Sequence, residues 1–169
     1  MSLSLYAATV PSFLQTLGAM QGLLAKAEDA DPDGARLLQA RLADDMLPFA
    51  WQMRSTTVHS LRAIEGVRAG TFSPDRSPPP QDYAGLRALV GDTVATLTAI
   101  DPAEIDGFVG RDMEFAMGEL RIDFTAESFL LSFALPNFYF HATTAYGILR
   151  ANGVELGKRD YLGQLRIKT

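Results

Sequence analysis

The sequence predicts one domain with an all-α fold, a four-helix bundle that carries a small β-hairpin between its third and fourth helices. Three observations support this prediction. The chain has 169 residues, which is the length of one ordinary domain. Apolar residues recur every three or four positions along four segments, as they do in amphipathic helices. Between the third and fourth segments the period changes to two, which is typical of strands. Residues 1–169 are therefore expected to form a single domain.

The first two predicted helices cover about residues 6–30 and 35–70. Pro11 lies near the start of the first helix, where its missing N–H matters least. An acidic turn at residues 29–34 ends that helix. Pro48 falls inside the second pattern. Because proline removes a backbone hydrogen bond and clashes with the preceding turn, we expect a break or a kink there.

The third predicted helix runs from about residue 81 to residue 100, after a proline-rich loop at residues 73–82. Residues 112–124 alternate between apolar and polar side chains on both sides of a Gly-Glu turn, and this pattern predicts the β-hairpin. A lone hairpin is only marginally stable in water. One face of this hairpin is therefore expected to pack on the helices.

The fourth predicted helix consists of a short run at residues 125–135 and a longer run at residues 136–153. Thr125 is suited to cap the first run, because its hydroxyl oxygen can accept a hydrogen bond from a free backbone N–H. Pro136 either restarts the helix or kinks it. The tail that follows is polar with scattered apolar residues, and its charged stretch at residues 157–160 is interpreted as a solvated or docking segment.

The composition excludes several classes of function. The chain has no cysteine, which excludes a disulfide framework, a thiolate metal site and a cysteine nucleophile. With 15 basic and 20 acidic residues its net charge is −5, so no nucleic-acid partner is expected. No apolar run is long enough to span a membrane and no signal peptide is recognised, so no membrane association is expected. Glycine-rich phosphate loops, dinucleotide-binding fingerprints and nucleophile elbows are also absent.

The two histidines, His59 and His141, are the candidate functional residues with an ordinary pKa near neutrality. At about 100° per residue, His59 falls nearly opposite the apolar stripe of the second helix, beside Gln52 and Arg62. His59 is therefore predicted to be a solvated surface residue, unless that face lines a cleft. A rotation by one residue at the proline would bring it close to the edge of the apolar stripe.

His141 lies at the margin of the apolar stripe of the fourth helix and is predicted to point into the bundle or its mouth. Two interpretations are open: a half-buried histidine that is hydrogen-bonded to a neighbour, or a metal ligand or general base. Two histidines hold zinc only with a third ligand, and Ala145, four residues after His141, has no lone pair to offer. The carboxylates that could complete such a site are Asp44, Asp45, Glu65, Asp123 and Glu127. A ferritin-like di-metal site is excluded, because neither histidine has a glutamate three residues before it.

Three stretches of the chain resemble a known family. They are MSLSLYAATVPSFLQTLG at the N-terminus, QARLADDMLPFAWQ in the second predicted helix, and LPNFYFHATTAYGILRANGVELGKRDYLG at residues 135–163. Together they resemble a bacterial family of uncharacterised domains in the DinB/YfiT-like superfamily of proposed metalloenzymes. The resemblance covers essentially the whole chain. It implies a DinB-like four-helix bundle, a cytoplasmic location and a homodimer.

The resemblance also implies a site. Several members of the wider superfamily are metal-dependent transferases or isomerases that act with low-molecular-weight thiols. Their metal site uses three histidines, one on the second helix and a pair four residues apart on the last. In this sequence His141 matches the first of that pair, Ala145 stands at the second position, and His59 lies on the second helix.

Three hypotheses of function follow, and no catalytic residue is assigned. The preferred one is a metal-free module that binds a small ligand or a partner near His141. The alternative is a divalent-metal-dependent transferase or hydrolase, in which His141 helps to bind zinc or nickel and the ion activates a water or a thiol. In the third, the interface of a homodimer is itself the function. Histidine side chains much more than about 5 Å apart would speak against the metal, since two Zn–N bonds of about 2.0–2.1 Å cannot join them. The candidate pocket residues are Gln52, His59, Asn137, His141 and Tyr146.

Overall fold

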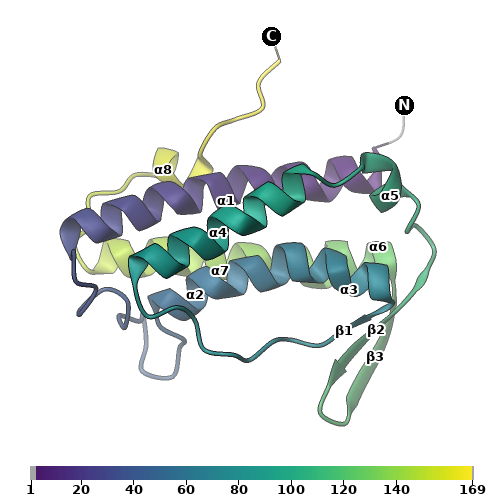
Figure 1. Ribbon diagram of the computed structural model, residues 1–169, viewed down its shortest axis with the longest axis horizontal. Coiled ribbons are helices and arrows are strands. Elements are labelled where there is room, and N and C mark those ends of the chain that lie inside the picture. The colour runs from purple at the N-terminus through teal and green to yellow at the C-terminus, as the bar shows by residue number, and fades with distance from the viewer. Residues whose placement is uncertain (1–2, 169) are drawn as a thin grey trace.

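The computed structural model describes residues 3–168, and four long helical segments make up most of it (Figure 1). The first segment is α1 (Leu5–Ala30), and the third is α4 (Tyr83–Thr98). The second and fourth segments each contain a π-helical stretch. They are α2 (Phe49–Thr57), η1 (Val58–Arg62) and α3 (Ala63–Ala69), and then α6 (Ala126–Phe129), η2 (Leu130–Ala134) and α7 (Leu135–Ala151). Both α1 and α2 contact α4 and α7, so the four segments enclose one core.

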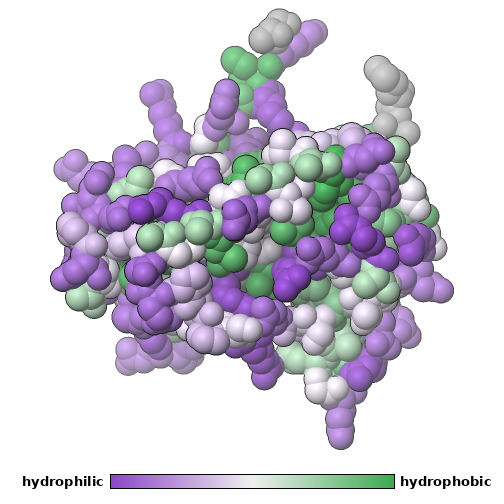
Figure 2. Space-filling model, in the orientation of Figure 1, coloured by the Kyte–Doolittle hydropathy of each residue, from purple (hydrophilic) through white to green (hydrophobic). Residues whose placement is uncertain are grey.

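The core between these segments is apolar. Phe13 of α1 and Phe138 of α7 are fully buried and meet edge to face, with ring centroids 4.9 Å apart. Such aromatic pairs contribute about 0.5–1.5 kcal/mol beyond the burial of their area. Hydrophilic residues cover most of the face in Figure 2, and the apolar patches between them are small. Among residues 3–168, no helix combines the length and the apolar character that a membrane span needs.

The first and third helices are confirmed close to their predicted bounds. Ser4 caps α1, because its hydroxyl accepts a hydrogen bond from the N–H of Ala7. Asp82 caps α4 in the same way, since its carboxylate accepts from the N–H of Gly85. The predicted cap at Thr125 is also present, and it starts α6. Pro136 does not restart the last segment, because the helical backbone continues directly from η2 into α7 across it.

The predicted hairpin is confirmed as β2 (Asp112–Met117) and β3 (Leu120–Thr125), which pair in antiparallel register. A third strand, β1 (Thr71–Phe72), pairs with β2 in parallel and was not predicted. The fold is therefore mostly helical with a small three-stranded sheet, rather than purely α. The sheet extends from one end of the molecule, near α3 and α6 (Figure 1). As expected, one face of β2 packs inward: Met113 and Phe115 are buried.

The prediction of a helix over residues 35–48 was wrong. The second helical segment begins at Phe49, directly after Pro48, and the preceding residues form turns and loops. The loop folds back on the helix: Phe49 donates its N–H to the carbonyl of Ala40 at 2.8 Å, and Ala50 donates to Leu38 at 3.1 Å. These tertiary hydrogen bonds replace helical ones, and they hold Leu38 in the core.

Two short helices complete the fold. One is α5 (Pro102–Asp106), which follows the third long segment. The other is α8 (Lys158–Leu162), which packs on α1 and shows that the charged stretch of the tail docks on the molecule. Asp160 of α8 accepts a hydrogen bond from the N–H of Gly157 and forms an ion pair with Lys26 of α1 at 2.9 Å.

A buried histidine pair as the candidate functional site

The second helical segment, which consists of α2, η1 and α3, is buried on nearly every side of α2, because α4 and α7 pack on α2. Several of its hydroxyl side chains donate hydrogen bonds to backbone carbonyls of the same segment. Thr56 donates to the carbonyl of Met53 at 2.6 Å, and Ser60 donates to the carbonyl of Thr56 at 2.7 Å. Polar side chains along one face of this segment therefore do not indicate that the face is exposed to solvent. The prediction that His59 lies on the surface was wrong: only 8% of the residue is exposed.

Two π-helical stretches meet at this point of the molecule. His59 lies in η1 and Phe133 lies in η2, and their ring centroids are 5.8 Å apart. A π-helical turn holds more residues than an α-helical turn, so it changes the face that the following side chains occupy. Single π-helical turns are frequently found at functional sites. The pair η1 and η2 therefore marks this position as a candidate site.

His141 of α7 faces His59 of η1 where these two elements contact each other. The two rings are nearly parallel, at an angle of 14°, and their centroids are 5.3 Å apart. Nδ1 of His141 is 2.7 Å from Oε1 of Gln52. Nε2 of Gln52 in turn donates to the carbonyl of Leu47 at 2.8 Å, which fixes the orientation of the amide. Because an amide oxygen only accepts, His141 donates from Nδ1, and its lone pair lies on Nε2.

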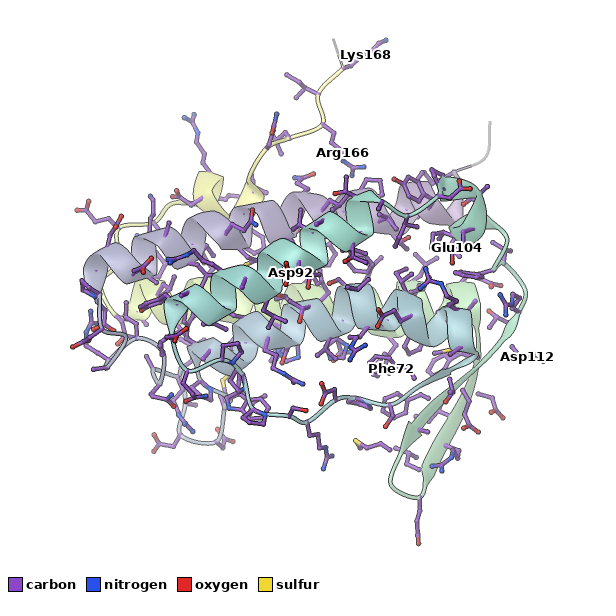
Figure 3. All side chains as sticks on the ribbon, viewed as in Figure 1. Phe72, Asp92, Glu104, Asp112, Arg166 and Lys168 are labelled. Atoms are coloured by element: carbon purple, nitrogen blue, oxygen red, sulfur yellow. The ribbon has the colours of Figure 1, made fainter. Side chains whose placement is uncertain are left out.

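His59 has no such partner. Its Nδ1 is buried and makes no hydrogen bond to any residue from 3 to 168. The ring is surrounded by aromatic side chains: Phe72 of β1 lies 6.0 Å away and Phe133 lies 5.8 Å away, centroid to centroid. Figure 3 shows Phe72 close to α3, where the sheet joins the helices. A buried polar atom without a partner destabilises a fold by about 1–3 kcal/mol.

Both imidazoles are neutral at pH 7. Burial, together with the charge of neighbouring His141, lowers the pKa of His59 from 6.5 to about 3. Burial alone lowers the pKa of His141 to about 4. Within residues 3–168, no carboxylate contributes to either shift. The site is thus a pair of uncharged nitrogen heterocycles in apolar surroundings.

Three of the five candidate residues meet in this site, namely Gln52, His59 and His141. Asn137 does not join them through a hydrogen bond, since its amide donates to the carbonyl of Phe133 on its own helix. Tyr146 packs edge to face on Tyr161 of α8. The sequence analysis missed Phe72, because a strand of two residues leaves no periodic pattern.

Two surface cavities of the molecule have other linings. A cavity of about 460 Å³ lies between α1 and the C-terminal tail, where Leu14, Gly18 and Arg166 contribute to its wall. Figure 3 shows Arg166 on this tail, above the helices. A second cavity, of about 250 Å³, includes Phe72 and Asp75 in its lining. Neither lining includes His59 or His141, and His141 is the half-buried member of the pair.

Gly66 of α3 permits the close approach of β1 that places Phe72 beside His59. A methyl group at this position would lie 2.9 Å from Cβ of Phe72 and 3.2 Å from the carbonyl oxygen of Thr71. We expect Gly66→Ala to destabilise the protein by about 1–3 kcal/mol through this overpacking. Urea unfolding monitored by circular dichroism measures the change. Gly18→Ala is the matched control, because its new methyl group meets no atom within 4 Å. Equal stability of the two variants would contradict the described packing.

The residues present do not fit the three-histidine metal site that the superfamily implies. The ring centroids of His59 and His141 lie 5.3 Å apart, so the distance criterion does not exclude a shared ion. The third position, however, is the fully buried Ala145, which has no donor atom. Among the described residues, no group of three or more histidine, aspartate or glutamate side chains is placed to hold a metal ion.

The fold and the site together define a mostly helical domain with a buried pair of histidines. The model of the family described as a domain of unknown function, DUF1993, matches residues 5–162, and the chain belongs to this family. The crystal structure of a DinB family member protein from Shewanella denitrificans is similar, with a TM-score of 0.79 and 28% sequence identity. The alignment covers 98% of this chain and 95% of that one. No curated protein matches the chain. The resemblance to a DinB-like family of uncharacterised domains is thereby confirmed.

Proposed function

We propose that the protein is a metal-free module that binds a small ligand at the His59–His141 pair. The observation that carries this proposal is Nδ1 of His59, which is buried without a partner beside the half-buried His141. A polar group on a ligand would provide the missing hydrogen bond and remove a penalty of about 1–3 kcal/mol. The two π-helical stretches at the same point support the proposal.

The alternative is a metal-dependent transferase or hydrolase with His141 as a ligand. One observation favours it: Gln52 fixes the imidazole of His141 through Nδ1, and histidines that bind metals are commonly oriented in this way. The number of donor atoms speaks against a metal enzyme, because zinc sites in enzymes use three protein ligands. The described chain places two imidazoles here and no carboxylate with them. We therefore favour the ligand-binding module.

Elemental analysis separates the two functions. Untagged protein is purified without chelators, then incubated with zinc or nickel and desalted. We expect no stoichiometric metal in the wild type, because the pair lacks a third donor. His141→Ala serves as the site variant, and Tyr146→Phe is the matched control on the same helix. About one equivalent of zinc or nickel in the wild type and in Tyr146→Phe, absent from His141→Ala, would overturn the proposal in favour of the metal enzyme.

A further inference from the structure

Strand β3 forms an open edge of the small sheet. The strand order is β1-β2-β3, so among residues 3–168 one side of β3 has no neighbouring strand. Figure 1 shows the hairpin extending away from the helices, and the main contacts of β3 are with β2 and with α6, which follows it. Natural proteins protect such edges with lysine, proline or a bulge. The run Leu120–Thr125 contains neither residue, and its register with β2 is continuous.

Alternate residues of β3 point their backbone N–H and C=O groups away from β2. Asp123 lies opposite Glu114, and Glu114 donates its N–H to the carbonyl of Gly70 on the other side of β2. Glu114 and Asp123 are therefore a non-hydrogen-bonded pair of the ladder, in which the backbone groups of Asp123 point outward. Because the pattern repeats every second residue, the backbone groups of Arg121 also point outward. The open edge thus presents donors and acceptors from both residues.

The side chain of Asp123 lacks a counter-charge within one chain. Glu114 lies directly opposite, and like charges in this position destabilise a sheet. Arg121 lies 3.4 Å from the carboxylate of Glu114, and no ion pair within residues 3–168 includes Asp123. On the other face of the strand, Leu120 and Ile122 are exposed apolar side chains. A partner of this edge therefore has to offer a cation and an apolar residue in alternation.

A second copy of β3 offers that alternation in antiparallel register. When Ile122 lies opposite its own copy, Arg121 of each chain lies opposite Asp123 of the other. Leu120 then lies opposite Phe124, so apolar side chains also meet on the second face. Arg121 and Asp123 are the residues whose backbone groups point outward, so each of these pairs exchanges both of its N–H···O bonds. Backbone pairing and side-chain pairing thus agree in this register.

Other registers of the same two strands are unfavourable. A slip by two residues places Arg121 opposite its own copy, or Asp123 opposite its own copy, according to the direction of the slip. Like charges directly opposite each other destabilise the pair. A slip by one residue places outward-facing residues opposite inward-facing ones, so the backbone hydrogen bonds between the strands are lost. The edge is therefore self-complementary in the register centred on Ile122.

We propose that two copies of the chain pair along β3, antiparallel and centred on Ile122, and so form one continuous sheet across a homodimer. The interface is isologous, which means that each copy uses the same surface. Each chain supplies the cation that Asp123 of the other chain lacks, and each covers the exposed Ile122 of the other. The dimer surface lies on the hairpin and is independent of the ligand site proposed at the histidine pair.

Charge reversal tests the register. In a pair of identical chains, Arg121→Asp places two aspartates opposite each other, and Asp123→Arg places two arginines opposite each other. We expect sedimentation velocity to show a dimer for the wild type as its concentration is raised, and a monomer for each variant alone. An equimolar mixture of the two variants is expected to restore the dimer, because every aspartate then lies opposite an arginine. Both positions are exposed, and circular dichroism checks that each variant is folded.

Two results of this experiment would overturn the proposal. A wild type that stays monomeric up to its highest soluble concentration would show that a second copy does not occupy this edge. Variants that each dimerise as well as the wild type would show that the copies meet at another surface.

Cysteine cross-linking tests the alignment of the two strands independently. The chain has no cysteine, so a single one can be introduced. Ile122→Cys places two thiols at a non-hydrogen-bonded pair, where Cα atoms lie about 4.5 Å apart, a distance that a disulfide bridges. We expect a covalent dimer after oxidation with diamide. Leu120→Cys is the matched control on the same face, because its copy would lie about 13 Å away along the strand, out of reach. Equal cross-linking of the two variants would contradict the proposed register.

Discussion

Acidification to pH 5 is expected to destabilise the wild-type protein by about 2 kcal/mol more than it destabilises a His59→Phe variant. The pKa of His59 lies at about 3 in the folded state, against 6.5 when the residue is free in solution. The unfolded chain therefore binds a proton more readily than the folded chain does. The contribution of neutral His59 to the free energy of unfolding is fully present above pH 6.5, and it is progressively lost as the pH falls toward 3. For these two pKa values, proton linkage gives about 2 kcal/mol at pH 5.

Phenylalanine at position 59 provides the matched comparison. It cannot titrate, and it keeps an aromatic ring among Phe72 and Phe133. The free energy of unfolding is measured by urea titration at pH 7.5, 6 and 5 for both proteins. Protonation of carboxylates contributes to both curves and cancels in their difference. If the two proteins lose stability in parallel over this range, the buried neutral state of His59 is wrong.

Truncation of Phe129 is expected to have the largest effect of any single substitution proposed for this protein. Phe129 is fully buried in α6 and contacts three other rings: Phe133 at 5.3 Å, Phe72 at 5.3 Å and Phe124 at 5.8 Å between centroids. Phe129→Ala removes the transfer free energy of the ring and leaves a cavity that rigid neighbours fill only partly. We expect a loss of about 3–5 kcal/mol.

The same substitution is expected to disturb the histidine pair, because Phe72 and Phe133 rest on Phe129 and also contact His59. Phe140→Ala is the matched control: this ring is 55% exposed and contacts His141 edge to face, so its loss is expected to change stability by no more than about 1.5 kcal/mol. Thermal and urea unfolding of both variants provide the measurement. A loss below about 1 kcal/mol for Phe129→Ala would show that this aromatic cluster is not packed as described.

The elements that the sequence predicted correctly are those that local interactions determine. Helix α1 has an uninterrupted apolar spacing and the Ser4 cap, and the hairpin has strict alternation on both sides of a turn. Residues 35–48 also have helical spacing, but their backbone is held by distant partners such as the hydrogen bond from Phe49 to Ala40. Such tertiary contacts override propensity and leave no periodic signal. The same reason explains why β1, whose partner lies about 40 residues away, was not predicted.

The candidate site was predicted in part. The helical wheel correctly placed Gln52 and His59 on one face of the second helix, and His141 near the interior. It failed to show that the two faces meet, because polar side chains along α2 and η1 are typical of a solvent-exposed face. Thr56 and Ser60 instead bond to carbonyls of their own helix, which allows a polar segment to be central. The π-helical turns were also unpredictable, since they depend on packing that one sequence does not reveal.

Nitrogen-15 NMR of the two histidines between pH 7.5 and pH 4.5 tests the central claim most directly, namely that buried His59 and half-buried His141 form an uncharged pair. The structure predicts that both rings are neutral at pH 5, since the pKa values are lowered to about 3 and about 4. It also predicts that His141 carries its proton on Nδ1, which donates to Gln52. A histidine that titrates with a pKa near 6.5, or a His141 protonated on Nε2 alone, would contradict the account.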